Sequence, residues 1–137
     1  MISNFLCCTR QKQMDSLETC CVDSLLDAIG EKPDLIQVLI GERAIDRLEK
    51  TIRKEVREEI RKNITGYLSN ELIIIVPDIV RDLIQNQTVQ SFDLPANART
   101  VYNIYAKYSN VPAYIVDVAW SIAESCLRPL RDELFFP

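Results

Sequence analysis

The sequence predicts an all-α fold, arranged as a single compact domain of about five or six helices. Only three glycines occur in 137 residues, which favours long helices over a turn-rich β fold. The longest periodic segment places its apolar residues three and four positions apart, as on one face of a helix. With 47% hydrophobic residues, the chain can also bury a core of the size that one domain needs.

The first predicted helix begins near residue 15, where Asp15 or Ser16 can serve as the N-cap. Its apolar residues recur at helical spacing, and Gly30 fits the position just past its end. Pro33 then suits the first position of a short apolar helix that ends near Gly41.

The strongest periodic signal runs from Glu42 to Leu68 and predicts one long amphipathic helix. Its apolar positions follow an eleven-residue repeat, which averages about 3.67 residues per turn and keeps the stripe nearly straight along the helix. Nearly all the other residues are charged, so the outer face should be solvated. The apolar stripe consists of Ile45, Leu48, Ile52, Val56, Ile60, Ile64 and Tyr67.

The segment that follows Ser69 is ambiguous in its first part. Residues 71–76 fit either a short buried strand or a helix, because they are rich in β-branched residues and also keep a helical spacing. We favour a helix, since no other segment of the chain supplies a partner strand. Pro77 then kinks this helix or begins a second one.

The C-terminal part predicts two more helices. After a polar loop over residues 85–95, one helix spans Ala96 to Tyr108 and another spans Pro112 to Leu127. Pro129 should end the second helix, because proline has no backbone N–H and its ring clashes with the preceding turn. The remainder of the chain is a short apolar tail.

The chain therefore divides into an N-terminal segment over 1–14, a helical domain over 15–128 and the apolar tail over 129–137. The first segment contains two adjacent cysteines, Cys7 and Cys8, and its only charged residues are two bases. Apolar residues and bases on either side of a cysteine pair suit a membrane surface. The residues expected to contact it are Phe5, Leu6, Arg10 and Lys12.

Leu6 to Gln13, which reads LCCTRQKQ, resembles the N-terminal membrane anchor of neuromodulin, where a Leu-Cys-Cys unit precedes basic residues and both cysteines are acylated. The resemblance covers about eight residues and implies S-acylation of Cys7 and Cys8, since two acyl chains anchor stably where one is marginal. One alternative is that the segment packs on the domain or is disordered. The other is zinc binding, although adjacent thiolates on a helix point apart; its ligands would be Cys7, Cys8, Cys20 and Cys21. For Cys20 and Cys21 we expect core packing.

The composition argues against catalysis and against nucleic-acid binding. The chain has no histidine, so it lacks the usual general base and the usual partner of a serine or cysteine nucleophile. It also has no glycine-rich phosphate loop, and we expect no enzyme and no cofactor. A net charge of −4 without a concentrated basic face disfavours nucleic acid as a partner. An odd number of cysteines without a signal-peptide pattern favours a reducing compartment.

Tyr105 to Ala119, which reads YAKYSNVPAYIVDVA, resembles the helix-turn-helix of lactose-repressor-type proteins. The turn falls at Ser109–Asn110, and Val116 and Val118 would pack inward. The resemblance covers about fifteen residues and implies a DNA-binding regulator, but the second helix lacks the Arg, Lys, Gln or Asn that would read bases near its start. We therefore favour a packed helical hairpin. The tyrosines expected at a core edge or an interface are Tyr102, Tyr105, Tyr108 and Tyr114.

Together these patterns predict a non-catalytic helical interaction or adaptor protein, in the cytoplasm or peripheral on the cytoplasmic face of a membrane. The alternative is a structural subunit of a larger assembly, such as a viral coat or a multi-protein particle, and a DNA-binding regulator is the third hypothesis. The expected partners are other proteins or a second copy, bound through helix faces and the C-terminal tail. The tail either folds back on its own domain or inserts into a neighbour; its anchors are Leu134, Phe135 and Phe136.

Overall fold

The computed structural model describes residues 2–34, 42–64, 68–86 and 96–135, and this part of the chain is all-α, as predicted. The described residues form five helices and no strand. The helices are α1 (Ile2–Gly30), α3 (Glu42–Asn63), α4 (Asn70–Gln85), α5 (Ala98–Lys107) and α6 (Ala113–Phe135). Residues 35–41, which make up most of the short helix expected after Pro33, lie outside the described residues.

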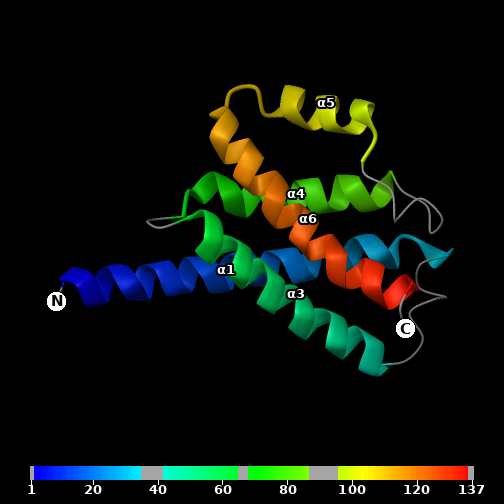
Figure 1. Ribbon diagram of the computed structural model, residues 1–137, viewed down its shortest axis with the longest axis horizontal. Helices are drawn as coiled ribbons and strands as arrows, with labels where there is room; N and C mark the ends of the chain where they lie inside the picture. The colour runs from blue at the N-terminus through cyan, green and yellow to red at the C-terminus, as the bar shows by residue number, and fades with distance from the viewer. Residues whose placement is uncertain (1, 35–41, 65–67, 87–95, 136–137) are drawn as a thin grey trace.

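Four of the helices pack into a bundle, and the fifth lies at its edge. α1 packs along α4 and against α3, while α6 packs against both α3 and α4. α5 contacts α4 and runs along the margin of the bundle, and the first turns of α1 extend past the other helices (Figure 1). The fold thus has two parts that stand clear of the main core: the start of α1 and the outer side of α5.

Helix α1 begins at Ile2, so the prediction that a helix starts at an N-cap near Asp15 or Ser16 is wrong. No glycine or proline interrupts the chain between Met1 and Gly30, and the helix therefore continues through the expected boundary at residue 14. Among the residues of α1 whose side chains are described, from Gln11 onward, the first buried one is Met14, which is 3% exposed.

The side-chain amide of Gln13 joins α1 to the start of the next helical segment. Its Nε2 donates to the carbonyl oxygen of Leu68 at 3.1 Å, and its Oε1 accepts from the Leu68 N–H at 3.2 Å. These two bonds satisfy backbone groups of a residue that precedes α4 and would otherwise have no helical partner.

The apolar stripe predicted for the long helix faces the core of the bundle. Ile45 and Ile64 are partly buried at its two ends and pack against the same core. Helix α3 ends at Asn63 and does not continue to Leu68, and Tyr67 lies outside the described residues. The members that are 0% exposed are Leu48, Ile52, Val56 and Ile60.

The ambiguous segment over 71–76 is helical and forms the first part of α4. Ser69 is its N-cap, as expected, and the Ser69 side chain accepts from the backbone N–H of Glu71. Pro77 lies inside the helix, which continues to Gln85. The burial of one whole face of α4 offsets the hydrogen bond that proline cannot make.

Helix α6 continues through Pro129 to Phe135, so the prediction that Pro129 ends it is wrong. The reason is tertiary packing, because Leu130 is 0% exposed and Leu134 packs against the core from the last turn. An ion pair from Arg47 of α3 to Glu133, with 3.2 Å between Nη2 and Oε2, also holds this turn. These contacts outweigh the cost of an interior proline, which is about 3 kcal/mol.

Candidate interaction surfaces

The N-terminal turns of α1 carry the cysteine pair predicted to be acylated. Cys7 and Cys8 belong to α1, whose first turns extend past the other helices in Figure 1. Lys12 is exposed. The side chains of the other predicted membrane residues, Phe5, Leu6 and Arg10, lie outside the described part, as do those of both cysteines.

The three remaining cysteines are free thiols within or beside the core. Cys21 and Cys126 are 0% exposed, which confirms core packing for Cys21, whereas Cys20 is only half-buried. A hydrogen bond with Cys126 and burial raise the pKa of Cys21 well above its ordinary value, and burial also raises the pKa of Cys20. Such thiols are poor nucleophiles, because the reactive species is the thiolate.

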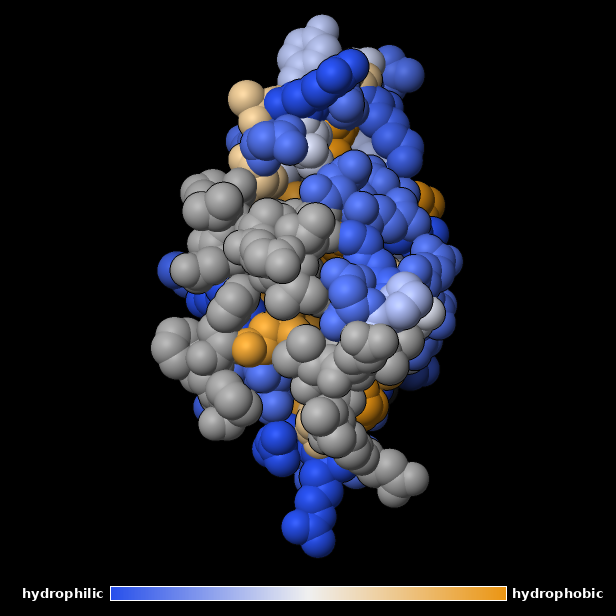
Figure 2. Space-filling model, turned by 90° about the vertical axis from the view of Figure 1, so that its right-hand side faces the viewer, coloured by the Kyte–Doolittle hydropathy of each residue, from blue (hydrophilic) through white to orange (hydrophobic). Residues whose placement is uncertain are grey.

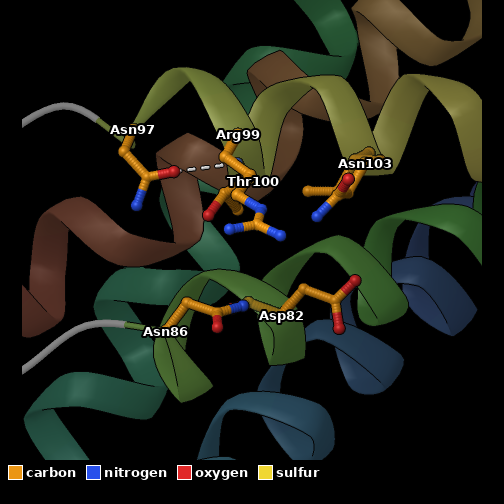
Figure 3. A pocket seen from close by; sticks show the side chains of 7 residues that line it. Asp82, Asn86, Asn97, Arg99, Thr100 and Asn103 are labelled. Carbon is orange, nitrogen blue, oxygen red and sulfur yellow. Dashed lines mark hydrogen bonds between the residues drawn. The ribbon is translucent and has the colours of Figure 1, made fainter.

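A polar cavity of about 410 Å³ lies between the end of α4 and the start of α5. Its carboxylate comes from Asp82, whose pKa is raised by burial and by the charge of Asp78. Arg99 points from α5 toward α4, and Asn97 caps α5 by accepting from the Thr100 N–H at 2.8 Å (Figure 3). Its lining offers amides, a guanidinium and a carboxylate, but neither a histidine nor a thiol. The remaining lining residues are Asn86, Asn103 and Ile104.

These cavity residues were not among the sequence-based candidates. The chain over 85–95 reads as a polar loop, and the helix after it was expected to begin at Ala96, one position before its observed cap, Asn97. Asparagine fits both a loop and a cap. The sequence therefore did not indicate that the end of the helix before that loop and the start of the helix after it would enclose a cavity.

A cluster around Asp78 fastens α5 to α4. Its carboxylate accepts hydrogen bonds from Lys107 Nζ and from the Tyr108 hydroxyl. Burial raises the pKa of Asp78, but these two hydrogen bonds and the charge of Lys107 outweigh it and hold the pKa below its ordinary value. Burial and the bond to Asp78 in turn raise the pKa of Tyr108.

The outer face of α3 carries a row of bases that we call the basic stripe. Two of them are bound to α1: Arg57 reaches both carboxylate oxygens of Glu18, at 2.8 and 3.1 Å, and Arg53 donates to Thr19 at 3.3 Å. Together with Glu58, the stripe lines a surface hollow of about 410 Å³. The basic stripe consists of Lys50, Arg53, Lys54, Arg57 and Arg61.

Aromatic and acidic side chains lie on α5 and on the first half of α6, the two helices joined by a short turn, and we call them the aromatic–acidic patch: Tyr102, Tyr105, Asp117, Trp120 and Glu124. The rings of Tyr105 and Trp120 have centroids 6.3 Å apart. The Tyr105 hydroxyl donates to Asp117 at 2.6 Å, and Trp120 Nε1 donates to Glu124. Burial and the bond to Asp117 raise the pKa of Tyr105 to about 12. Tyr102, one turn earlier on α5, is 72% exposed.

The segment that resembles a helix-turn-helix forms a hairpin of α5 and α6 with its turn at residues 108–111. Val116 is buried and Val118 is half-buried against the core, as expected. The first turn of α6 presents Tyr114, which is 70% exposed, and the acid Asp117. The first basic residue of α6 is Arg128.

The C-terminal tail is in part the last turn of α6. Leu134 is half-buried against the core, so this residue of the predicted anchor contacts its own domain. The side chain of Phe135 and the whole of Phe136 lie outside the described residues.

In the described part of the chain, no three acidic or cysteine side chains come together as a metal site would require. None of the described helices is both long enough and apolar enough to cross a membrane. Comparison of the chain with models of protein families, with curated proteins and with solved structures finds no match.

Proposed function

We propose that the chain is a non-catalytic interaction protein, held on the cytoplasmic face of a membrane by the first turns of α1, and that it presents its helix faces to protein partners. The observation that carries this proposal is that the first turns of α1, a helix that begins at Ile2 and includes Cys7 and Cys8, extend past the other helices (Figure 1). At a rise of about 1.5 Å per residue, Cys8 lies about 9 Å along the helix axis before Met14, the first buried residue of α1 among those whose side chains are described.

A projecting helix end suits acylation for two physical reasons. In the sequence both cysteines precede Met14, the first residue of α1 that is buried among those whose side chains are described, so acylation falls at the end of the helix ahead of the described core. Two acyl chains give stable anchoring where one is marginal, and a base beside them adds about 1 kcal/mol of attraction to anionic headgroups. The exposed Lys12 is such a base.

The proposal of a non-catalytic role is supported by the chemistry of the cavity and of the thiols. The cavity between α4 and α5 is lined by amides, one guanidinium and one carboxylate, without a histidine or a thiol. The pKa values of Cys20 and Cys21 are raised, which opposes thiolate formation. The charged residues of α3 and the aromatic residues of α5 and α6 instead offer surfaces for binding another protein.

Membrane attachment is tested by expressing the chain in cells and separating membrane and soluble fractions. Cys7→Ser with Cys8→Ser should move the protein to the soluble fraction and abolish incorporation of an alkyne analogue of palmitate. Cys20→Ser is the matched control, because Cys20 is also a free thiol of α1 but is half-buried beside the core; it should leave both readouts unchanged. Equal fractionation of the double variant and the unaltered chain would contradict the proposal.

A further inference from the structure

We propose that two copies of this chain associate head to tail, the basic stripe of α3 in one copy binding the aromatic–acidic patch of α5 and α6 in the next. The inference names a partner for the proposed interaction function and rests on that part of it alone, since it requires no membrane. All the side chains that form the two surfaces belong to the part of the chain that the structure describes. The two surfaces differ in their charge, in their shape and in where they lie on the bundle.

The basic stripe has charge available for a partner. Arg53 and Arg57 are bound to Thr19 and Glu18 of α1, as described above. Lys50, Lys54 and Arg61 are exposed and form no ion pair with the described residues. Glu58 is the acid that lines the same hollow. The outer half of α3 therefore presents more positive than negative charge to solvent.

The aromatic–acidic patch has the chemistry that receives such cations. Ammonium and guanidinium groups bind over the faces of tryptophan and tyrosine, and more strongly where carboxylates lie beside the rings. Asp117 and Glu124 each use one oxygen to accept from an aromatic donor in the patch, which leaves the other oxygen for a cation. The nearest base on α6, Arg128, is directed away from the patch toward Glu55 and Glu59 of α3, at 3.8 Å from each.

The shapes of the two surfaces are also complementary. The hollow along the basic stripe, about 410 Å³, has room for an aromatic side chain between the aliphatic stems of its lysines and arginines. Tyr102 is 72% exposed and is the most exposed ring of the patch. A tyrosine inserted among lysine and arginine stems would bury apolar surface and make cation–π contacts in the same step.

The position of the two surfaces makes the contact heterologous. The stripe lies on the flank of α3 that faces α1, as its bonds to Glu18 and Thr19 require, whereas the patch lies on α5 and the first half of α6. One contact leaves a free stripe at one end and a free patch at the other. Copies would therefore add to form chains or a closed ring, and not a symmetric dimer.

The test uses sedimentation equilibrium and a pair of complementary variants, all in the Cys7→Ser, Cys8→Ser background so that neither acyl chains nor those thiols contribute. Lys50→Glu with Lys54→Glu reverses the stripe, and Asp117→Lys with Glu124→Lys reverses the patch. The background protein should self-associate at low salt and dissociate in about 1 M salt, where the Debye length is about 3 Å. Each variant alone should be monomeric.

An equimolar mixture of the two variants should form a 1:1 dimer, because the intact stripe of one fits the intact patch of the other. The inference would be overturned if the mixture stayed monomeric, or if the background protein stayed monomeric at low salt. It would also be overturned if the stripe bound anionic vesicles but not a second copy of the chain. If the patch variant fails to fold by circular dichroism, Tyr102→Ser takes its place and should weaken self-association at least about tenfold.

A matched pair on the same helix controls for net charge. Lys54 belongs to the stripe, whereas Lys62 is exposed on α3 outside it. Lys54→Glu should raise the dissociation constant at least about tenfold, and Lys62→Glu should change it by less than about threefold. Equal effects would show that overall charge and not the stripe governs association. Loss of membrane binding in the proposed anchor test has no bearing on this result, so the two proposals fail separately.

Discussion

Helices α4 and α5 lie side by side but are held in the fold by different kinds of contact. α4 buries a full apolar face, whereas the only described buried residue of α5 is Ile104. α5 is attached mainly by polar contacts, from Lys107 and Tyr108 to Asp78 of α4 and from Tyr105 to Asp117 of α6. The buried residues of α4 are Leu72, Ile75, Val76, Ile79, Val80, Leu83 and Ile84.

This difference indicates that α4 serves mainly to stabilise the bundle, whereas α5 serves mainly to carry binding surfaces. The apolar face of α4 is part of one core with α1, α3 and α6, so its residues determine whether the bundle folds. α5 contributes little to that core and can detach locally, which is typical of elements that carry binding surfaces. α5 supplies one side of the polar cavity and two of the five residues of the aromatic–acidic patch, Tyr102 and Tyr105. At the end of the bundle seen in Figure 2, the described surface is mostly hydrophilic, with small hydrophobic areas.

The largest effect is expected from a core substitution in α4. Ile79→Ala should lower the free energy of unfolding by about 2–5 kcal/mol, because Ile79 is 0% exposed and its loss leaves a cavity. Ile74→Ala is the control on the same helix: Ile74 is 70% exposed, and its substitution should change the value by less than about 0.5 kcal/mol. Chemical denaturation measures both. Similar losses from the two substitutions would mean that α4 does not face a single core.

A smaller global effect is expected from the equivalent substitution in α5. Ile104 is 2% exposed, yet Ile104→Ala should lower the free energy of global unfolding by less than about 1 kcal/mol, because α5 would detach before the bundle unfolds. The substitution should instead remove hydrogen-exchange protection from the backbone amides of α5 and leave that of α4 unchanged. A loss as large as that from Ile79→Ala would show that α5 is an integral part of the core.

The sequence predicted the bundle better than the elements at its ends. The spacing of Val56 and its neighbours specifies a buried helix face directly, because burial of that face is encoded in one contiguous segment. The continuation of α6 past Pro129 could not be predicted, since it depends on contacts of Leu130 and Glu133 with distant parts of the chain. The start of α1 at Ile2 was missed because Asp15 and Ser16 are good caps but also fit an exposed helix surface.

The candidate surfaces were predicted only where they are local in sequence. Cys7 and Cys8 are adjacent in the sequence, so this pair can be recognised without knowledge of the fold. The aromatic–acidic patch joins Tyr105 of α5 to Trp120 of α6, and Arg57 reaches Glu18 across 39 positions. The charged residues of α3 predicted a solvated outer face, but their order in the sequence did not show that bases gather on one flank.

The smallest effect concerns the polar attachment of α5 and depends on pH. Hydrogen bonds and the charge of Lys107 hold the pKa of Asp78 below its ordinary value despite burial, so the ionised carboxylate stabilises the folded chain. This contribution is present above the unfolded pKa, about 3.9, and is lost as the pH falls through the lower folded pKa. Because Asp78 is only partly buried, solvent still screens its charge, and Asp78→Asn should cost only about 0.5–1 kcal/mol at neutral pH. The difference from the unaltered chain should disappear at acidic pH.

Asp82, one turn further along α4, provides a control of opposite sign. Burial and the neighbouring charge of Asp78 raise its pKa, so its contribution to stability is fully present below the unfolded pKa and is lost as the pH rises through the folded pKa. At neutral pH the ionised Asp82 therefore opposes folding slightly, and Asp82→Asn should be neutral or stabilising by up to about 0.5 kcal/mol. Denaturation curves at a series of pH values measure both substitutions. If Asp78→Asn and Asp82→Asn changed stability in the same direction at neutral pH, the bonds from Lys107 and Tyr108 would not be what attaches α5 to the bundle.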